Sequence, residues 1–450
     1  MKTKVLTSGR PSGLLLRFAL PLMAGNVFQE LYTITDTAIV GRFLGVNALA
    51  AVGIGAWITW MLFSAVQGIN QGFSVSAANS FGAGNIDQLK KSMGNSAILS
   101  VAVSVLVLIV GEIILAPLLR LLDTPEEIFD TALLYLRIFC AGCPVMAIYN
   151  YAACHLRALG NSTAPLRAMI ISSITNIVLD LLFVGPFKWG VAGAIIATVI
   201  AQGVAAVYSV RCLLKIDFLR FGKSDFIPDF KLCKNLLMLG VPMSMQNIII
   251  SVGGLIVQMV VNRFGITFIA GVTATNRMYG LLETAAVSYG YAVTTFTGQN
   301  NGAGEYKRIK QGVRAGCAIG TLTSAAICAV MLLFGKNILS LFISGSAAEV
   351  AATLDVAWKY LFVMSVCLPI LYILHAVRSA IVGLENSFIP LLSGILELII
   401  RVGAAFIFPA LWGAESIFLA EPLAWFGGMV LLLFGYIWCI KTKFKKGGLK

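Results

Sequence analysis

The chain has 450 residues, of which 58% are hydrophobic and 12% are charged, whereas a soluble domain carries roughly 25% charged residues. A mean hydropathy of +0.89 excludes an ordinary soluble enzyme and also an outer-membrane barrel, whose alternating strands average to a lower value. The net charge of +13 comes from Lys and Arg residues in alternate connections, which is typical of membrane topology and requires no nucleic-acid partner. We therefore expect an all-α membrane protein.

Apolar segments long enough to cross a bilayer follow one another along the whole chain. Twelve are predicted, at 14–40, 48–78, 97–119, 131–154, 166–184, 190–212, 236–261, 268–296, 313–334, 356–376, 388–409 and 421–440. The longest connection, 215–234, contains five basic residues and three Asp residues. The sequence thus predicts an N-terminal six-helix bundle at 1–214, a cytoplasmic linker at 215–235 and a C-terminal six-helix bundle at 236–450.

The distribution of basic residues predicts the orientation of the chain. Of the 33 Lys and Arg residues, about 24 fall on the side that holds both termini and the even-numbered connections, and about six fall on the other side. Because basic residues stay on the cytoplasmic side, we expect a multi-pass protein of the cytoplasmic membrane with both termini in the cytoplasm. The basic residues would contact anionic lipid headgroups.

The two halves of the sequence resemble each other. Four matches occur in the same order in both, namely 21–26 with 242–247, 42–43 with 263–264, 82–84 with 302–304, and 161–165 with 386–390. Six spans separate equivalent points, so the bundles should share one orientation, related by a pseudo-two-fold axis along the membrane normal, with a cleft between them. Pro21 and Pro242 occupy matching positions, and they are predicted bending points because proline lacks the N–H of a helical bond.

A cluster of polar side chains is predicted within the spans of the first half. Asp36 lies in span 1 and Asp180 in span 5, and Asn176 precedes Asp180 by four residues, which places both on one helical face. Tyr135 in span 4 and Thr198 in span 6 could join them. A charged side chain at bilayer depth is costly, so each carboxylate here is a functional candidate.

Oxygen atoms alone would line this cluster, and that composition limits the ion it can hold. Such ligands suit Na⁺, for which Asp36, Asn176, Asp180 and Thr198 are the candidates, or a shared proton, and they do not suit Zn²⁺. Two carboxylates close together in a medium of low dielectric cannot both stay ionised without cost. The alternative is structural: Asp36 would sit at the outer mouth of its helix and Asp180 would cap or pair with Arg137.

The second half lacks these carboxylates, with Val257 and Ala405 at the equivalent positions. Glu397 and Arg401 are four residues apart in span 11, which favours a local ion pair. Glu283 could meet a cationic substrate or could pair with Arg277 or Arg401. The candidate substrate-cleft residues are Asn26, Gln29, Arg277, Met278 and Glu283.

Three motifs carry a resemblance to a known family. They are PLMAGN at 21–26, continuing to TDT at 35–37, GAGN at 82–85, and GNSTAP at 160–165, with related elements in the second half. With them the whole chain resembles the multidrug and toxic compound extrusion (MATE) family. The resemblance implies a twelve-helix, two-lobe antiporter that exports amphipathic, often cationic compounds in exchange for inward H⁺ or Na⁺.

The resemblance also bears on the residues of the site. Asp36, Asn176, Asp180 and Thr198 look like the first-lobe cation site of the branch related to DNA-damage-inducible transporters, and Tyr135 falls where that branch has a site tyrosine. In the branch similar to sodium-driven norfloxacin exporters, span 7 has a Glu eight residues after its opening Pro. Ile250 stands there in this chain, which shifts the weight to the first lobe.

Other functions remain as alternatives. A flippase for lipid-linked saccharides has a related fold with a more basic cavity, and a passive channel would need no coupling ion. An intramembrane enzyme would need a nucleophile or metal motif, yet the chain has only two His residues and no His-Glu-x-x-His sequence. We expect a monomeric transporter of small amphipathic molecules in contact with membrane lipid, with no enzymatic activity and no cofactor besides the coupling ion.

Overall fold

The structure, a computed structural model, describes residues 3–122, 124–343 and 346–446. Within these ranges all regular structure is helical. The α-helices are Pro11–Gly82 (α1), Ile86–Leu121 (α2), Glu126–Ala158 (α3), Thr163–Val184 (α4), Gly190–Leu214 (α5), Phe230–Val261 (α6), Ile266–Gly302 (α7), Tyr306–Ser340 (α8), Ala347–Gly383 (α9), Phe388–Trp412 (α10) and Ala420–Lys446 (α11). Three short 3₁₀ helices, Lys223–Phe226 (η1), Asn262–Phe264 (η2) and Ala414–Leu419 (η3), lie in the connections.

The long helix α1 contains two of the predicted spans. Its helical conformation is interrupted at Gly45, whose φ of 82° and ψ of −173° are open to glycine but strained for residues with a side chain. Counting the two parts of α1 separately gives twelve helical segments, so the predicted all-α class and helix number are confirmed. Pro21 and Pro242 both lie inside continuous helix, and bending at these prolines stays a prediction.

Ten of these segments are long and apolar enough to cross a membrane, which identifies a multi-pass membrane protein. The two described segments that do not qualify are the first part of α1 and all of α7. These are the segments that contain Asp36 and the Arg277–Glu283 region. Their lower hydropathy therefore coincides with the polar residues that the sequence singles out as functional candidates.

The chain forms two compact units. Unit 1 comprises Leu20–Asn247 and the described residues before Leu6, and unit 2 comprises Leu6–Ala19 and the described residues from Ile248 onward. The boundaries therefore fall inside α1 and inside α6, whereas the sequence places the division in the 215–235 linker. The predicted bundles at 1–214 and 236–450 stay a prediction.

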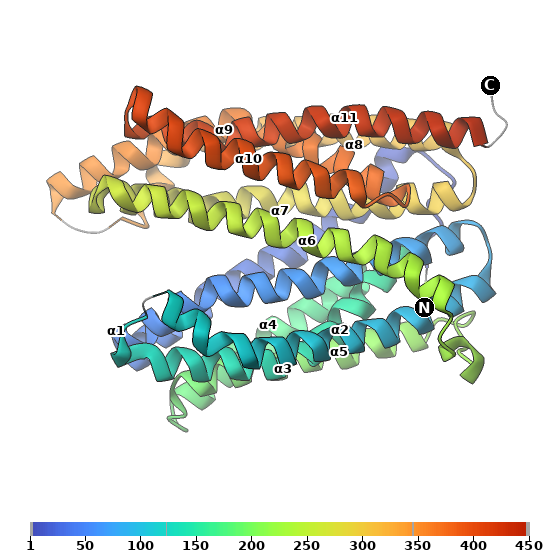
Figure 1. Ribbon diagram of the computed structural model, residues 1–450, viewed down its shortest axis with the longest axis horizontal. Coiled ribbons are helices and arrows are strands. Elements are labelled where there is room, and N and C mark those ends of the chain that lie inside the picture. Colours follow the sequence, from blue (N-terminus) through green and yellow to red (C-terminus); the bar gives the residue numbers. More distant parts are fainter. Residues whose placement is uncertain (1–2, 123, 344–345, 447–450) are drawn as a thin grey trace. The chain divides into compact units, whose positions relative to one another are not determined.

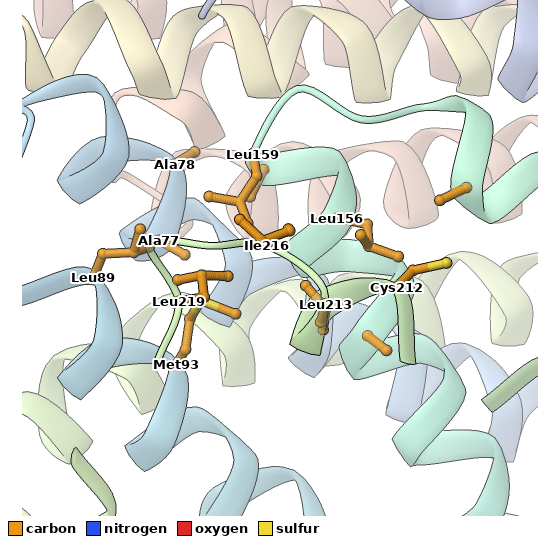
Figure 2. Packing of buried hydrophobic residues seen from close by; sticks show 13 residues of the cluster. Ala77, Ala78, Leu89, Met93, Leu156, Leu159, Cys212, Leu213, Ile216 and Leu219 are labelled. Atoms are coloured by element: carbon orange, nitrogen blue, oxygen red, sulfur yellow. The ribbon is translucent and has the colours of Figure 1, made fainter. Parts of the chain in front are cut away.

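Each unit is built from neighbouring helices that bury small and branched side chains. In unit 1, α3 packs against α2 and α5, and α4 packs against α5 (Figure 1). One core of this unit joins the ends of α1, α2, α3 and α5 to the chain that follows α5, through Leu89, Met93, Leu156, Leu213 and Ile216 (Figure 2). In unit 2, α9 packs against α7, α8 and α11, and α10 packs against α11.

Candidate cation-binding site

The five predicted ligands come from four helices of unit 1. Asp36 lies on α1, Tyr135 on α3, Asn176 and Asp180 on α4, and Thr198 on α5. Asp180 is 0% exposed and Asn176 is 1% exposed, so the polar face of α4 points into the unit. The spacing of four residues therefore placed these two side chains together, as the sequence predicts.

The carboxyl groups of Asp36 and Asp180 face each other closely enough to share a proton in a hydrogen bond. In the ionised form these carboxylates have few hydrogen-bond donors around them. Among the described residues no hydrogen bond of normal length reaches Oδ1 of Asp36 or either carboxylate oxygen of Asp180, although the Asn176 side chain lies near enough to Asp180 to interact with it. Buried carboxylates without donors are costly, and two together also repel. A bound proton or small cation would relieve both costs.

Asn176 and Thr198 add further oxygen atoms beside the carboxylates. The Asn176 amide donates from Nδ2 to Oγ1 of Thr198 over 3.2 Å, and the Thr198 hydroxyl donates to the Ala194 carbonyl over 3.3 Å. These bonds orient both side chains, and no donor from the described part of the chain bonds Oδ1 of Asn176, which is buried. Two carboxylates, an amide oxygen and a hydroxyl form a ligand set that fits a hard monovalent cation.

Two tyrosines and a glutamine complete the surroundings. Tyr135 lies within electrostatic reach of Asp36, Asp180 and Tyr32. Tyr32 interacts with Asp36 and with the side chain of Gln202, whose buried Oε1 has no hydrogen-bond partner among the described residues. Sequence reasoning missed Tyr32 and Gln202.

A simple signal was nevertheless present for both residues. Tyr32 precedes Asp36 by four residues and Gln202 follows Thr198 by four, and residues four apart share a helical face. Extending each predicted ligand by one helical turn would have found them.

The alternative pairing of Asp180 with Arg137 is wrong, because Arg137 has another partner. Arg137 pairs through Nε with Glu112 over 3.2 Å, and both side chains are well exposed. In the lower-dielectric interior Asp180 therefore faces Asp36 and Asn176 and no arginine.

The candidate cleft residues divide between the units. Asn26 and Gln29 are half-buried in unit 1, while in unit 2 Arg277 is exposed and Met278 is buried. Glu283 lies 3.6 Å from Nε2 of His375, so neither predicted arginine partner is the one found. A substrate-binding role for these five residues stays a prediction.

The predicted ion pair between Glu397 and Arg401 is wrong. Glu397 pairs with Arg378 of α9 and accepts a bond from Oγ of Ser393 over 2.7 Å, while Arg401 pairs with Glu421 of α11 over 2.9 Å. Each side chain turns to a neighbouring helix. A spacing of four residues permits a local pair, but neighbouring helices offered both groups an opposite charge that spacing cannot reveal.

The comparisons with known proteins agree with these findings. The MatE family model matches residues 21–182 and again residues 242–407, in keeping with the internal duplication. The chain is 32% identical over 335 residues to the Probable multidrug resistance protein YoeA of Bacillus subtilis, covering 73% of this chain and 72% of that protein. It is 23% identical to the DNA damage-inducible protein F of Escherichia coli, covering 77% and 76% of the two chains.

Solved structures share the fold across nearly the entire chain. A structure described as the outward-facing conformation of a multidrug resistance MATE family transporter of the MOP superfamily superposes with a TM-score of 0.89 and 25% identity. It covers 99% of this chain and 100% of that one. With both halves matching the family model, the chain belongs to the MatE family of multidrug and toxic compound extrusion transporters, the family that its sequence resembles.

Proposed function

We propose that this protein is a secondary active antiporter, which exports amphipathic and often cationic compounds in exchange for inward H⁺ or Na⁺. The observation that carries the proposal is the pair formed by the half-buried Asp36 and the buried Asp180, which face each other. Among the described residues, Oδ1 of Asp36 and both carboxylate oxygens of Asp180 lack a hydrogen bond of normal length. Such a pair destabilises the folded protein when both groups are ionised, and a bound cation would relieve that cost. Relatives named multidrug resistance proteins support the class of substrate.

The coupling cation acts on the charge of the pair. While both carboxylates are ionised, they repel each other and attract any cation. Binding of H⁺ or Na⁺ neutralises them, which lowers the free energy of the conformation that has just bound the ion. It also removes the attraction for a cationic substrate, so substrate leaves on the outer side. Loss of the coupling ion to the cytoplasm then resets the pair for another substrate.

Asn176, Thr198 and Gln202 have supporting roles in this scheme. Asn176 holds Thr198 in place through its amide and offers Oδ1 to the ion, and Gln202 offers a second amide oxygen. Na⁺ could be held by Asp36, Asn176, Asp180 and Thr198, while a proton needs only the two carboxyl groups. Each inward elementary charge supplies roughly 2.3 kcal/mol per 100 mV of membrane potential, which is enough for accumulation without ATP.

The remaining parts of the proposal concern the setting. The protein would act as a monomer in the cytoplasmic membrane, with both termini in the cytoplasm and its basic residues against lipid headgroups. The saccharide flippase is less favoured, since a basic cavity needs unpaired cations. The buried Arg401 and the half-buried Arg378 instead face carboxylates within unit 2.

Ethidium efflux from vesicles tests the proposal. Purified protein is reconstituted, loaded vesicles are exposed to an imposed pH gradient or an imposed Na⁺ gradient, and the measurement is repeated with Asp36→Asn and Asp180→Asn. Asp130→Asn serves as the matched control, because Asp130 is an exposed acid of unit 1. We expect gradient-driven efflux in the wild type and the control, and its loss in both site variants.

Each contrary outcome has a meaning. Efflux without any gradient would indicate a passive channel, and absence of ethidium transport together with movement of a lipid-linked saccharide would indicate a flippase. Unchanged coupled efflux in both site variants would refute the assignment of the cation site.

A further inference from the structure

The connection after α5 is fixed to unit 1 by apolar contacts. Ile216 and Leu219 are 1% and 2% exposed and belong to the same core as Met93 and Leu159 (Figure 2). The ring of Phe218 stacks on Phe81 of α1, with centroids 5.8 Å apart and planes 17° apart. A connection that contributes two buried aliphatic side chains to a core is a structural part of that unit.

Polar contacts hold the next part of the connection against α2. Asn95 accepts the backbone N–H of Asp229 at Oδ1 over 2.8 Å and donates from Nδ2 to the carbonyl of Ile227 over 3.3 Å. Gly94 provides the space for this approach, because a Cβ atom there would lie 2.1 Å from the carbonyl oxygen of Asp225. Gly94 and Asn95 therefore hold the connection against α2 through contacts with its backbone.

The first half of α6 is fixed to the same unit by a close helix crossing. A Cβ atom on Gly72 of α1 would lie 2.5 Å from Cα of Gly240, and one on Gly68 would lie 2.8 Å from Cα of Ser244. Small residues four apart on both helices allow such a close backbone approach. Asn247 ends this contact by donating from Nδ2 to the Ser64 carbonyl over 3.1 Å.

Beyond Asn247 the same helix has its contacts in unit 2. The carbonyl of Ile250 accepts a bond from Nη1 of Arg401 over 3.2 Å, and a Cβ atom on Gly253 would lie 3.0 Å from that nitrogen. The helix thus passes from one set of partners to the other within three residues. Gly253 and Gly254 follow at once, and adjacent glycines make a helix easier to bend.

We infer that residues 216–247 form a fixed strap on unit 1, and that conformational change of the second half is absorbed inside α6, in the stretch 248–254. The connection between the halves is then a rigid part of unit 1 and does not act as a flexible linker. The inference rests on the proposed transport cycle for the existence of a movement, while the anchoring itself rests on the contacts above. It goes beyond that cycle by locating where the chain must bend.

A cross-link between α2 and the strap tests the inference during transport. Sγ of the native Cys233 lies 3.3 Å from Oδ1 of Asn95, so Asn95→Cys places a second thiol within reach of a disulfide. Oxidation should join them, which mass spectrometry of digested protein can verify. Asn95→Cys combined with Cys233→Ser is the control that cannot form this link.

Opposite results are expected from the two views of the connection. If the strap is fixed, the cross-linked protein effluxes ethidium at least as fast as its reduced form, which has lost the hydrogen bonds of Asn95. If the connection must detach during the cycle, cross-linking abolishes efflux while the oxidised control keeps its rate. That second result would overturn the inference.

Hydrogen exchange decides the anchoring even if the wild-type protein transports no ethidium. The backbone amides of Gly222 and Asp229 donate to the Asp225 carboxylate and to Asn95. We expect peptides covering 216–229 to exchange slowly in acidic and alkaline buffer, with and without Na⁺. Exchange as fast as that of the free peptide in any of these buffers would refute the fixed strap. Failure of transport with slow exchange would refute the proposed function alone.

Discussion

Replacement of Asp180 by Asn should stabilise the protein while it destroys coupling. The Asp180 side chain is 0% exposed and faces Asp36, and its oxygens accept no hydrogen bond of normal length from the described residues. Two unit charges about 4 Å apart at an effective dielectric constant of 20 repel by about 4 kcal/mol. The introduced amide removes this repulsion and can donate to Asp36. If structural relaxation already relieves half of this repulsion in the wild type, Asp180→Asn should raise the free energy of unfolding by about 2 kcal/mol.

The sign and condition of this gain can be measured by thermal unfolding followed by tryptophan fluorescence. In alkaline buffer without Na⁺ the wild-type pair lacks its cation, and Asp180→Asn should unfold several degrees higher. In mildly acidic buffer or excess Na⁺ the wild type is itself neutralised, so the difference should shrink. An equal shift in all buffers, or a similar shift in Asp130→Asn, would refute the reasoning.

Three further variants test other contacts. Gln202→Leu should weaken the affinity for the coupling ion by about tenfold, because it removes an oxygen ligand worth about 1.4 kcal/mol. Isothermal titration with the cation measures this affinity, and an unchanged value would exclude Gln202 from the site. Arg401→Met should destabilise the fold by about 3 kcal/mol by leaving the half-buried Glu421 without its partner. Denaturant unfolding would show this loss, and replacement of both residues should largely reverse it. Gly72→Ala should cost about 1–3 kcal/mol through overpacking against α6, whereas Gly53→Ala on the same helix, where a Cβ atom meets nothing within 4 Å, should be nearly neutral.

The helix content could be predicted because the bilayer imposes it. Apolar segments of suitable length must satisfy their backbone groups internally, which leaves the helix as the solution. The predicted segments 14–40 and 48–78 fall on the two parts of α1, and the interruption at Gly45 lies between them. The compact units could not be predicted, because hydropathy indicates which segments avoid water but not which helices pack against each other. The first half of α6 belongs to unit 1 through glycines that a hydropathy scan treats as neutral.

The candidate site shows the same contrast. Asp36 and Asp180 could be found because a carboxylate in an apolar span is conspicuous, and Asn176 because it shares a face with Asp180. Gln202 and Tyr32 are ordinary residues in a helix, and only their place beside the carboxylates makes them notable. The spacing of four residues predicts a pair of Glu397 with Arg401, but their partners Arg378 and Glu421 lie on other helices. The spacing of residues along the chain does not show which helices pack together.

The start of the chain is held by residues made much later, which has a consequence for biosynthesis. Leu6 is 1% exposed, its N–H donates to Oε1 of Gln299 over 2.8 Å, and the carbonyl of Gly9 accepts a bond from Arg308 over 2.6 Å. These residues are synthesised before their partners, which follow nearly three hundred residues later. The segment that precedes α1 must therefore wait at the membrane surface until Gln299 and Arg308 have been synthesised. Nascent chains halted before Gln299 should expose this segment to protease, and chains released beyond Arg308 should protect it.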